Sequence, residues 1–432
     1  MVEQTLASGD TGIKSPEAIL RWLGASKSKP RLLFFAVSWM YGGVERGLSS
    51  ILPELSEHFD IFLLTLPKDE ENHFSLPQRI THLEIESWTN LPQKVASICS
   101  LLQIDVMVGC CNCSNITEEL YEKVQEADVK IIAYNQENYF YPYLSRYHRS
   151  IIPKRKEAFH NANVVAWLTS ASARIYALTS PNSVTLPYPM PIEAEHVDNG
   201  QRIKHRILAV GRFTDWVKRV DRILRCFSET LKIVPDAELV LVGSYDLALS
   251  IPEYAPENLQ DLIDSLNIPV EQLRFEGIQA ITAKHYKQAA VFLLTSESEG
   301  QPMVLLEAGV YGLPCVVQDF PGVDDIIEDG VNGFIVPQDD AAVMGKKVAL
   351  LLQNQEMRNR MGGEAQKLLK RFSKKSIAEK WISLLDIVLK SESQKEINAR
   401  ILESMANQAP IDEKLVKHIY SVLKSIGREL QV

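Results

Sequence analysis

Hydrophobic residues form two series of short apolar runs that alternate with segments of helical spacing. The first series comprises RLLFFAVSW (31–39), DIFLLTL (60–66), VMVGC (106–110), KIIAYN (130–135), NVVAWLT (163–169) and the proline-bounded VTLPYPM (184–190). The second comprises RILAVGRF (206–213), AELVLVGSY (237–245), LRFEG (273–277), AVFLLTS (290–296) and PCVVQ (314–318). Continuous apolar runs that alternate with helices are typical of parallel sheets with right-handed crossovers.

The helical segments support this interpretation. Apolar residues recur at helical spacing in VERGLSSILPELSEHF (44–59), where Pro53 predicts a kink or an early end. Further helices are expected over SPEAILRWL (15–23), VDRILRCFSETLKI (220–233) and AEKWISLLDIVLK (378–390). The predicted fold class is therefore α/β, with two Rossmann-like domains that face a cleft and a C-terminal helical extension.

The length of the chain also favours two domains, because 432 residues exceed what one ordinary core holds. We predict an N-terminal tail with a short helix over 1–30 and a first Rossmann-like domain over 31–192. A polar linker, 193–205, leads to a second Rossmann-like domain over 206–373. Helices then occupy 374–432, and the first of them is expected to cross back to the N-terminal domain.

Composition narrows the class of protein. The chain has 46 basic and 55 acidic residues, a net charge of −9 that argues against a general nucleic-acid binder. Three of the six cysteines, Cys110, Cys111 and Cys113, lack the second ligand pair that zinc sites use, so small buried side chains are expected there. The opening residues show no secretory signal, and no run approaches the length of a membrane span. We expect a cytoplasmic protein.

The stretch SESEGQPMVLLEAGVYGLPCVV (296–317) holds two glutamates on either side of a turn that opens a helix. Gly300 permits unusual backbone angles, and a helix that starts after Pro302 offers N–H groups and a partial positive charge to a phosphate. Glu299 and Glu307 are carboxylates of the kind that accept two O–H bonds from a sugar diol. On spacing alone, a carboxylate that favours the helix dipole and a surface glutamate are an equally good explanation.

Two further clusters help to decide between a ligand-binding and a structural role for these glutamates. GRFTDWVKR (211–219) follows a predicted strand, which places Arg212 and Lys218 at the carboxyl edge of a parallel sheet, where two cations suit a diphosphate leaving group. By itself this pair would be read as two solvated cations. Gly42 and Gly43 follow the first strand and would let backbone N–H groups approach an anion. The chain contains no GxGxxG, no Walker A loop and no Asp-x-Asp motif.

Together these clusters resemble the retaining glycosyltransferases of family four, which have the two-Rossmann GT-B fold. EGQPMVLLE matches the E-x7-E signature of that family, VGRFTDWVKRVDRIL (210–224) its diphosphate-binding segment, and YGGVERGLSSILPEL (41–55) its glycine-rich loop and helix. The resemblance covers about residues 31–390. It implies that Glu299 binds the hydroxyls of the donor sugar and Glu307 binds the ribose. The implied catalytic residues are Glu299, Arg212 and Lys218, and the implied donor site adds Gly43, Gly300, Gln301, Met303, Val304 and Glu307, with backbone N–H groups near 301–304 on the phosphates.

The sequence departs from that family in three places. Pro302 stands where glycine is frequent, which removes one N–H donor. The family often has a histidine in the N-terminal domain, whereas the matching stretch here, YNQENYFYPY (134–143), has none, and Gln136 is the expected occupant. The extension over 391–432 has no counterpart in the resemblance.

The stretch YNQENYFYPYLSRYHR (134–149) is rich in aromatic residues, which suits either an acceptor sugar or internal packing. For an acceptor, Asn135, Gln136 and Glu137 are the candidate ligands of its hydroxyls. The basic run HRSIIPKRK (148–156) would contact anionic lipid or an anionic acceptor at the inner membrane face, and a solvated surface is the alternative.

The resemblance implies a retaining, metal-independent hexosyltransferase that moves a sugar from a nucleotide-diphosphate sugar to an acceptor hydroxyl. The expected setting is polysaccharide or glycoconjugate synthesis, with a sugar or glycolipid acceptor. No cofactor is expected beyond the nucleotide sugar as co-substrate. The alternatives are an epimerase or phosphorylase on the same fold, for which nothing marks a pyridoxal-phosphate lysine, and a nucleotide-sugar-binding protein without activity.

Overall fold

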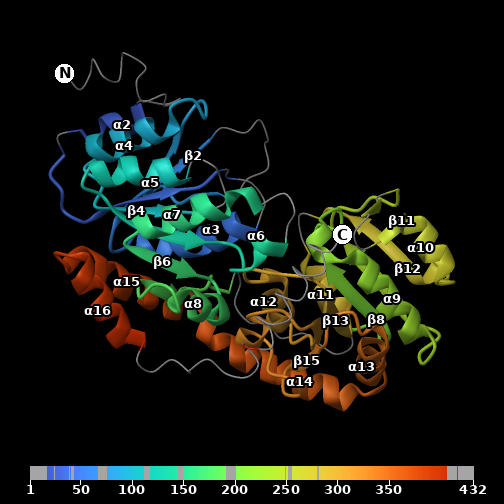
Figure 1. Cartoon of the computed structure of the whole chain (residues 1–432). Coiled ribbons are helices and arrows are strands. Elements are labelled where there is room, and N and C mark those ends of the chain that lie inside the picture. Colours follow the sequence, from blue (N-terminus) through green and yellow to red (C-terminus); the bar gives the residue numbers. More distant parts are fainter. Residues whose placement is uncertain are drawn as a thin grey trace. The chain divides into compact units, whose positions relative to one another are not determined.

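The computed structural model divides the chain into two compact units (Figure 1). Unit 1 comprises Met1–Pro189 and Lys374–Val432, and unit 2 comprises Met190–Ser373. The structure describes residues 17–23, 25–37, 39, 43–66, 75–110, 117–144, 149–190, 201–248, 250–251, 255–279, 282–405 and 416. The predicted linker therefore falls within unit 2, and its residues 193–200 lie outside the described part of the chain.

A parallel sheet is the centre of unit 1. Among the described residues its strands are β1 (Arg31–Phe35), β2 (Asp60–Thr65), β3 (Ile80–Glu84), β4 (Val106–Gly109), β5 (Lys130–Asn135), β6 (Val164–Trp167) and β7 (Ser183–Thr185). Their order is β3-β2-β1-β4-β5-β6-β7, and every pairing is parallel. This is the Rossmann arrangement, in which the strand order reverses between the first and fourth strands. The apolar runs form these strands because both faces of the sheet are covered by helices.

The helices of unit 1 come from both ends of the chain. They are α2 (Glu17–Leu20), α3 (Gly43–Leu55), α4 (Leu91–Leu101), α5 (Thr117–Glu126), α6 (Tyr141–Leu144), the 3₁₀ turn η1 (Arg149–Ile151), α7 (Ile152–Asn161), α8 (Ser170–Ala177), α15 (Lys374–Lys390) and α16 (Gln394–Met405). Pro53 lies inside α3, which ends two residues later at Leu55, so the predicted early end is confirmed and the segment to Phe59 was too long.

Helix α15 is held to unit 1 at both ends of its contact with the sheet. Trp381 is fully buried, with its ring edge-on to Tyr134 at 5.0 Å between centroids. At the C-terminal end of α15, Lys130 Nζ donates to the carbonyls of Val388 and Ser391, each at 2.7 Å. The last carbonyls of a helix have no intrahelical partner, so a lysine is a natural cap for them.

Unit 2 repeats the arrangement. In the part of it that the structure describes, the parallel strands are β8 (Arg206–Val210), β9 (Glu238–Val242), β12 (Leu273–Gly277), β13 (Val291–Leu294), β14 (Cys315–Gln318) and β15 (Gly333–Val336), in the order β12-β9-β8-β13-β14-β15. A separate antiparallel pair is formed by β10 (Ser250–Ile251) and β11 (Ala255–Asn258). The helices are α9 (Val220–Leu231), α10 (Leu259–Ser265), α11 (Ala283–Gln288), α12 (Met303–Val310), α13 (Ala341–Gln353) and α14 (Gln355–Leu368), with 3₁₀ turns η3 (Trp216–Lys218), η4 (Val270–Gln272), η5 (Val323–Asp325) and η6 (Leu369–Phe372).

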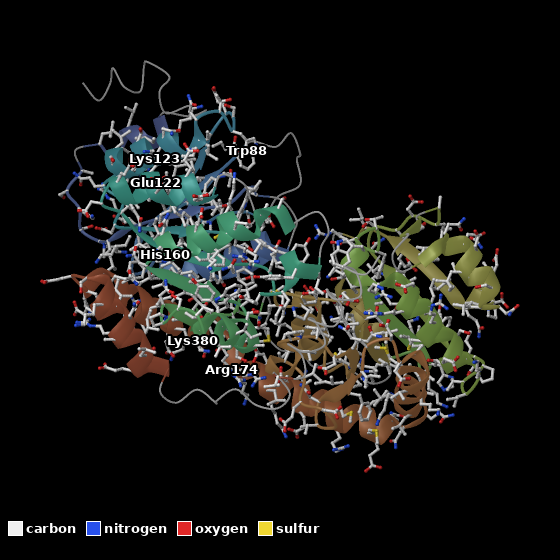
Figure 2. The ribbon with its side chains drawn as sticks, in the orientation of Figure 1. Trp88, Glu122, Lys123, His160, Arg174 and Lys380 are labelled. Atoms are coloured by element: carbon white, nitrogen blue, oxygen red, sulfur yellow. The ribbon has the colours of Figure 1, made fainter. Side chains whose placement is uncertain are left out.

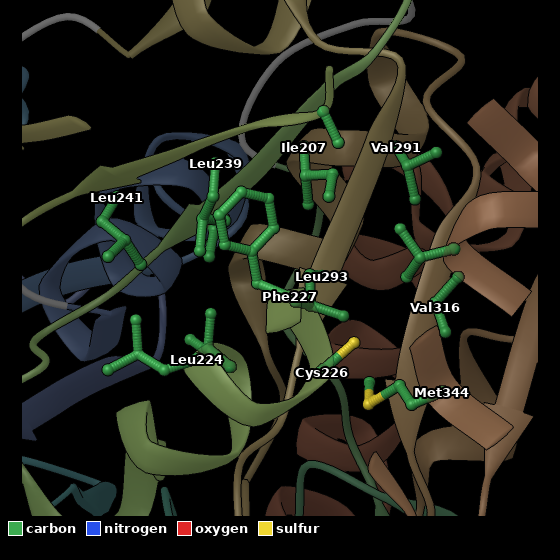
Figure 3. Packing of buried hydrophobic residues seen from close by; sticks show 14 of the residues in the cluster. Ile207, Leu224, Cys226, Phe227, Leu239, Leu241, Val291, Leu293, Val316 and Met344 are labelled. Carbon is green, nitrogen blue, oxygen red and sulfur yellow. The ribbon is translucent and has the colours of Figure 1, made fainter. Parts of the chain in front are cut away.

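The core of unit 2 lies between this sheet and the helices α9 and α13 (Figure 3). Ile207, Leu239 and Val291 from three neighbouring strands meet Phe227 of α9 and Met344 of α13. Cys226 and Cys315 are buried in unit 2, and Cys99 and Cys110 are buried in unit 1. Burial raises the pKa of the Cys226 thiol to about 12, so the small side chain stays neutral and serves packing.

Four described strands were not predicted from the sequence: the antiparallel pair β10 and β11, and one strand of each parallel sheet. β3 (ITHLE) and β15 (GFIV) are edge strands, each with one neighbour in its sheet. An edge strand has less to bury, so β3 carries Thr81, His82 and Glu84 and lacks the continuous apolar run of the central strands. Within the described residues, no helix is both long enough and apolar enough to span a bilayer.

A pair of adjacent glycines in α14 tests how tightly this helix packs. A Cβ on Gly362 would lie 2.0 Å from the carbonyl oxygen of Gly312, whereas a Cβ on Gly363 would meet nothing within 4 Å. We expect Gly362→Ala to lower the free energy of unfolding by about 1–3 kcal/mol, because helix and backbone must separate. Gly363→Ala should raise it by roughly 0.5–1 kcal/mol through helix propensity. Urea unfolding of both variants measures the difference, and equal effects would contradict the packing argument.

Candidate functional site

Two loops meet at the point of unit 2 where the strand order reverses. Strands β8 and β13 are neighbours in the sheet, and the loops 211–219 and 295–302 leave their carboxyl ends. The loops are joined directly, because the Glu297 N–H donates to the carbonyl of Val217 at 2.8 Å and Thr295 Oγ1 donates to the carbonyl of Arg219 at 3.0 Å. Open α/β sheets bind ligands at this position.

An ion pair connects the two loops and brings together two of the predicted site residues. Lys218 Nζ lies 2.6 Å from Glu299 Oε1, and the Ser296 hydroxyl donates to the same oxygen at 2.6 Å. The two charged side chains are mostly buried, with 19% and 12% of their surfaces exposed. An ammonium has three N–H donors and a carboxylate four acceptor positions, so each group retains hydrogen-bonding capacity toward a ligand.

Arg212 is not part of this ion pair. Its side chain is 76% exposed, and its Nη2 lies 3.5 Å from Asp215 Oδ2 on the same loop. A role of Arg212 on a diphosphate therefore stays a prediction, and it would require the side chain to turn toward the incoming anion.

Glu307 is buried inside α12. Only 4% of the residue is exposed, and the Tyr286 hydroxyl of α11 donates to its Oε2 at 2.7 Å. The ring of Tyr286 stacks on Tyr311, with 5.5 Å between centroids and 14° between planes. The simple explanation of Glu307 as a surface residue is wrong, because the side chain is buried and hydrogen-bonded to α11. Binding of a ribose by Glu307 stays a prediction.

The start of α12 follows directly on Glu299. Helix α12 begins at Met303 after Pro302, and no side chain caps it. The N–H of Leu305 bonds the carbonyl of Pro302 at 2.9 Å, while Gln301 is 8% exposed and Val304 is half-buried. The first N–H groups of a helix attract anions. The predicted phosphate contacts near Gln301, Met303 and Val304 would use these groups, with Gly300 at the turn before them.

A buried network of charges behind the ion pair was not predicted from the sequence. Arg219 makes two parallel bonds of 2.9 Å to the carboxylate of Asp221, and its Nη1 donates to Glu297 Oε2 at 2.9 Å. Arg222 Nη2 forms an ion pair with the same oxygen of Glu297 at 2.8 Å, and Arg222 Nε donates to Asp339 Oδ1 at 2.6 Å. Arg219 also has a φ of 48°, a conformation uncommon for residues with a side chain. The network thus connects the loop next to Lys218 to the loop next to Glu299 and keeps the two residues opposite each other.

Glu297→Gln tests this network. The change leaves two buried guanidinium groups short of one carboxylate, so we expect the free energy of unfolding to fall by about 1.5–3 kcal/mol. The matched control is Asp339→Asn at the rim of the same network, where the acidic side chain is 66% exposed and the expected loss is within about 1 kcal/mol. Thermal and urea unfolding measure both, and a larger loss for Asp339→Asn would contradict the assigned order.

A known protein family matches most of unit 2. The family model described as glycosyl transferases group 1 matches residues 193–368. The matched range covers the Lys218–Glu299 pair, Glu307 and the network, so every element of the unit 2 site lies in the group 1 region.

Curated relatives match about two fifths of this chain. An uncharacterized glycosyltransferase of Haemophilus influenzae is 29% identical over 180 residues, which is 41% of this chain and 48% of the relative. The N-acetyl-alpha-D-glucosaminyl L-malate synthase of Bacillus anthracis is 28% identical over 182 residues, 42% of this chain and 45% of the relative. The chain thus spans about half the length of the curated relatives it matches.

Solved structures extend the likeness to the whole fold. Anabaena HepE in complex with UDP aligns with a TM-score of 0.66 at 14% identity, over 82% of this chain and 99% of that one. A structure of Staphylococcus aureus TarM with UDP aligns with a TM-score of 0.67 at 11% identity, over 84% and 100%. The chain has the GT-B fold, plus C-terminal helices, and the expected fold class is confirmed.

Outside the group 1 region, the predicted acceptor residues lie at the carboxyl end of β5 in unit 1. Asn135 is 1% exposed, and Glu137 is half-buried. The amide of Gln136 is engaged within the unit, because its Nε2 donates to the carbonyl of Tyr134 at 3.0 Å and its Oε1 accepts from the Tyr188 hydroxyl. Acceptor binding by these three residues stays a prediction.

Much of the aromatic stretch is internal packing. Tyr134 is fully buried and Phe140 is 6% exposed, while Tyr139 stacks on Tyr143 with 6.0 Å between centroids. Gly43 is the first residue of α3, and a Cβ there would meet nothing within 4 Å. Gly42, Cys111 and Cys113 lie outside the described residues.

In the described part of the basic run over 148–156, the charged side chains do not share one exposed surface, and His148 lies outside the described residues. Lys154 and Lys156 of α7 are exposed, but Arg155 between them is only 6% exposed. The sequence could not distinguish them, because neighbouring positions of a helix face different directions.

Proposed function

We propose that this protein is a retaining glycosyltransferase that moves a sugar from a nucleotide-diphosphate sugar to an acceptor hydroxyl. The observation that carries the proposal is the Lys218–Glu299 ion pair of 2.6 Å at the switch point of a group 1 unit. It sets a cation and a carboxylate side by side at the start of α12, where a diphosphate and a sugar would each find a complementary group.

The proposed chemistry follows from these groups. Glu299 accepts hydrogen bonds from the hydroxyls of the donor sugar, and Glu307 binds the ribose. Lys218, Arg212 and the N–H groups at the start of α12 stabilise the negative charge that develops as the bond between the sugar and the diphosphate breaks. A new bond forms from the acceptor oxygen to the anomeric carbon on the same face, and the departing diphosphate takes the acceptor proton. The proposed reaction uses no metal ion and no cofactor besides the nucleotide sugar.

The class of substrate is proposed from the neighbours. HepE was solved with UDP-glucose, and a relative from Campylobacter jejuni, 29% identical over 158 residues, is named as an N-acetylgalactosaminyltransferase that acts on an undecaprenol-linked glycan. We therefore propose a uridine nucleotide sugar as donor and a sugar or glycolipid in polysaccharide or glycoconjugate synthesis as acceptor. Lys154 and Lys156 would contribute to a peripheral contact with an anionic membrane surface.

A panel of donors tests the proposal. Purified protein is incubated with UDP-, GDP- and ADP-sugars without acceptor, in the presence of EDTA, and thermal stability and slow donor hydrolysis are measured. We expect one nucleotide sugar to raise the melting temperature and to be hydrolysed with release of the sugar in its original anomeric form. Stabilisation without hydrolysis would indicate a binding protein, and no response to any donor would reject the proposed function.

A further inference from the structure

Several buried side-chain donors of unit 1 have no acceptor, and three of them lie on neighbouring elements. These three are Arg155 Nε of α7, Asn135 Nδ2 at the end of β5, and Trp167 Nε1 at the end of β6. The three residues are 6%, 1% and 0% exposed. None of these nitrogen atoms has a hydrogen-bond partner among the described residues. Buried polar groups are nearly always paired, so three unpaired donors in one place require an explanation.

The three donors belong to one neighbourhood. Asn135 and Trp167 are register partners on adjacent parallel strands, so their side chains leave the sheet on the same face. That face is covered by α7, because Ala158 and Phe159 share a core cluster with Trp167. The side chains of unit 1 are drawn in Figure 2, where His160 marks the last turn of α7.

Arg155 connects the other two residues. Its guanidinium carbon lies 5.5 Å from the centroid of the Trp167 ring, and its Nη2 lies 3.5 Å from Asn135 Oδ1. The neighbouring Phe159 ring is 5.2 Å away. The donors are therefore contributed by a helix and two strands that meet at the carboxyl edge of the sheet.

The charge of Arg155 is not neutralised by the part of the chain that the structure describes. Among these residues it makes no ion pair, and its contacts are the long bond to Asn135 and the aromatic rings. Arg219 and Arg222 of unit 2 are about as deeply buried, at 5% and 4%, and each is paired with carboxylates. A buried cation is costly without an anion, and aromatic faces offset only part of that cost.

Every missing partner at this place is an acceptor. We propose that Arg155, Asn135 and Trp167 form a binding site for an anionic oxygen group, a carboxylate or a phosphate. Two N–H donors and a guanidinium would bind the anion, an arrangement that matches the geometry of a carboxylate and of a phosphate. The anion is either the charged group of an acceptor that enters beside Gln136 or a small anion held by the folded unit. This inference does not depend on the proposed sugar transfer.

The indole N–H signals of the full-length protein, labelled with ¹⁵N at tryptophan, give a direct test. The protein is titrated with inorganic phosphate and, separately, with acetate, and sodium chloride keeps the ionic strength constant. Trp167→Phe identifies the signal of interest, and the Trp216 signal reports anion binding in unit 2 separately. We expect the Trp167 signal to shift downfield by at least 0.3 p.p.m. and to saturate with at least one of the two anions.

Variants separate an anion site from a structural cation. Arg155→Met should abolish the saturable shift and the anion-dependent rise in melting temperature, whereas Lys156→Gln, which removes an exposed charge from the same helix, should retain both. Should Arg155→Met fail to fold, Asn135→Leu takes its place, with at least a tenfold weaker binding expected. A Trp167 signal that moves with neither anion, or an equal shift in these variants, would overturn the proposal and leave the donors to an internal water.

A last titration identifies the source of the anion. Glycerol 3-phosphate is compared with inorganic phosphate at the same concentrations. A shift with both supports a site for the charged group of an acceptor, and a shift with phosphate alone supports a small anion enclosed by the fold.

Discussion

Lys218→Ala should lower the rate of sugar transfer by about 100- to 1,000-fold, which is the usual effect of removing one group that stabilises developing negative charge. Lys218 is the cation that lies against Glu299, and its ammonium would face the diphosphate as the glycosidic bond breaks. The change also leaves Glu299 with the Ser296 hydroxyl as its remaining partner of the two described, so the carboxylate becomes less favourably placed. The loss should appear mainly in kcat, because the charge to be stabilised is greatest in the transition state.

The control for this prediction is Lys232→Ala in the same unit. That lysine is 64% exposed and pairs with Glu229 three residues before it in α9, so its removal changes the net charge equally without touching the site. Its kcat and KM should stay within about twofold of the parent protein, since rim charges contribute little. A Lys218→Ala variant that keeps more than a third of the parent kcat would contradict the assigned role.

Gly243→Ala should be the most destabilising single-methyl change in unit 2 among those considered. Gly243 follows β9 with a φ of +136°, and a Cβ there would lie 1.8 Å from the carbonyl oxygen of Gly211, the first residue of the loop that carries Lys218. The backbone strain is about 1–3 kcal/mol. The forced separation of the two backbones adds about 1–3 kcal/mol. Urea unfolding would measure the sum, and donor hydrolysis should fall as well, because the loop must move.

Gly277→Ala is the matched control for Gly243→Ala. Gly277 accepts a hydrogen bond from the Gly243 N–H and also has a positive φ, +66°, but a Cβ there would meet nothing within 4 Å. It should cost only the backbone strain of about 1–2 kcal/mol. Equal losses for the two variants would show that the contact with Gly211 is readily relieved.

The central strands could be predicted because buried parallel strands require continuous apolar runs. KIIAYN corresponds to β5 residue for residue. LRFEG likewise matches β12, although β12 is an edge strand whose residues alternate between half-buried and exposed. The edge strand β3 could not, since a strand with one neighbour tolerates polar residues such as its Thr81, His82 and Glu84. Strand β15 was missed although its sequence GFIV is apolar. Pro53 ends its helix early as local rules predict, with two further residues of α3 beyond it.

The site was predictable to the extent that it depends on topology. Lys218 and Glu299 each follow a strand, and neighbouring strands of a parallel sheet bring such loops together. The partners of Arg219 could not be found this way, because Glu297 lies 78 residues away and no spacing rule relates them. Burial of Arg155 was equally hidden, because a basic run in a sequence gives no sign of which side chain turns inward.

The place of α15 has a consequence for how the chain folds during synthesis. Unit 1 takes its first 189 residues from the beginning of the chain and its last segment from residue 374 onward, with all of unit 2 between them. A ribosome therefore completes unit 2 while Trp381 and the helix end that Lys130 caps have yet to be made. Since domains usually fold as they emerge, unit 2 can become native before Trp381 covers Phe34 and Tyr134 in the sheet of unit 1. The segment 190–373 is accordingly the natural unit to express alone, whereas a fragment that stops before residue 374 would expose an apolar surface that invites chaperones.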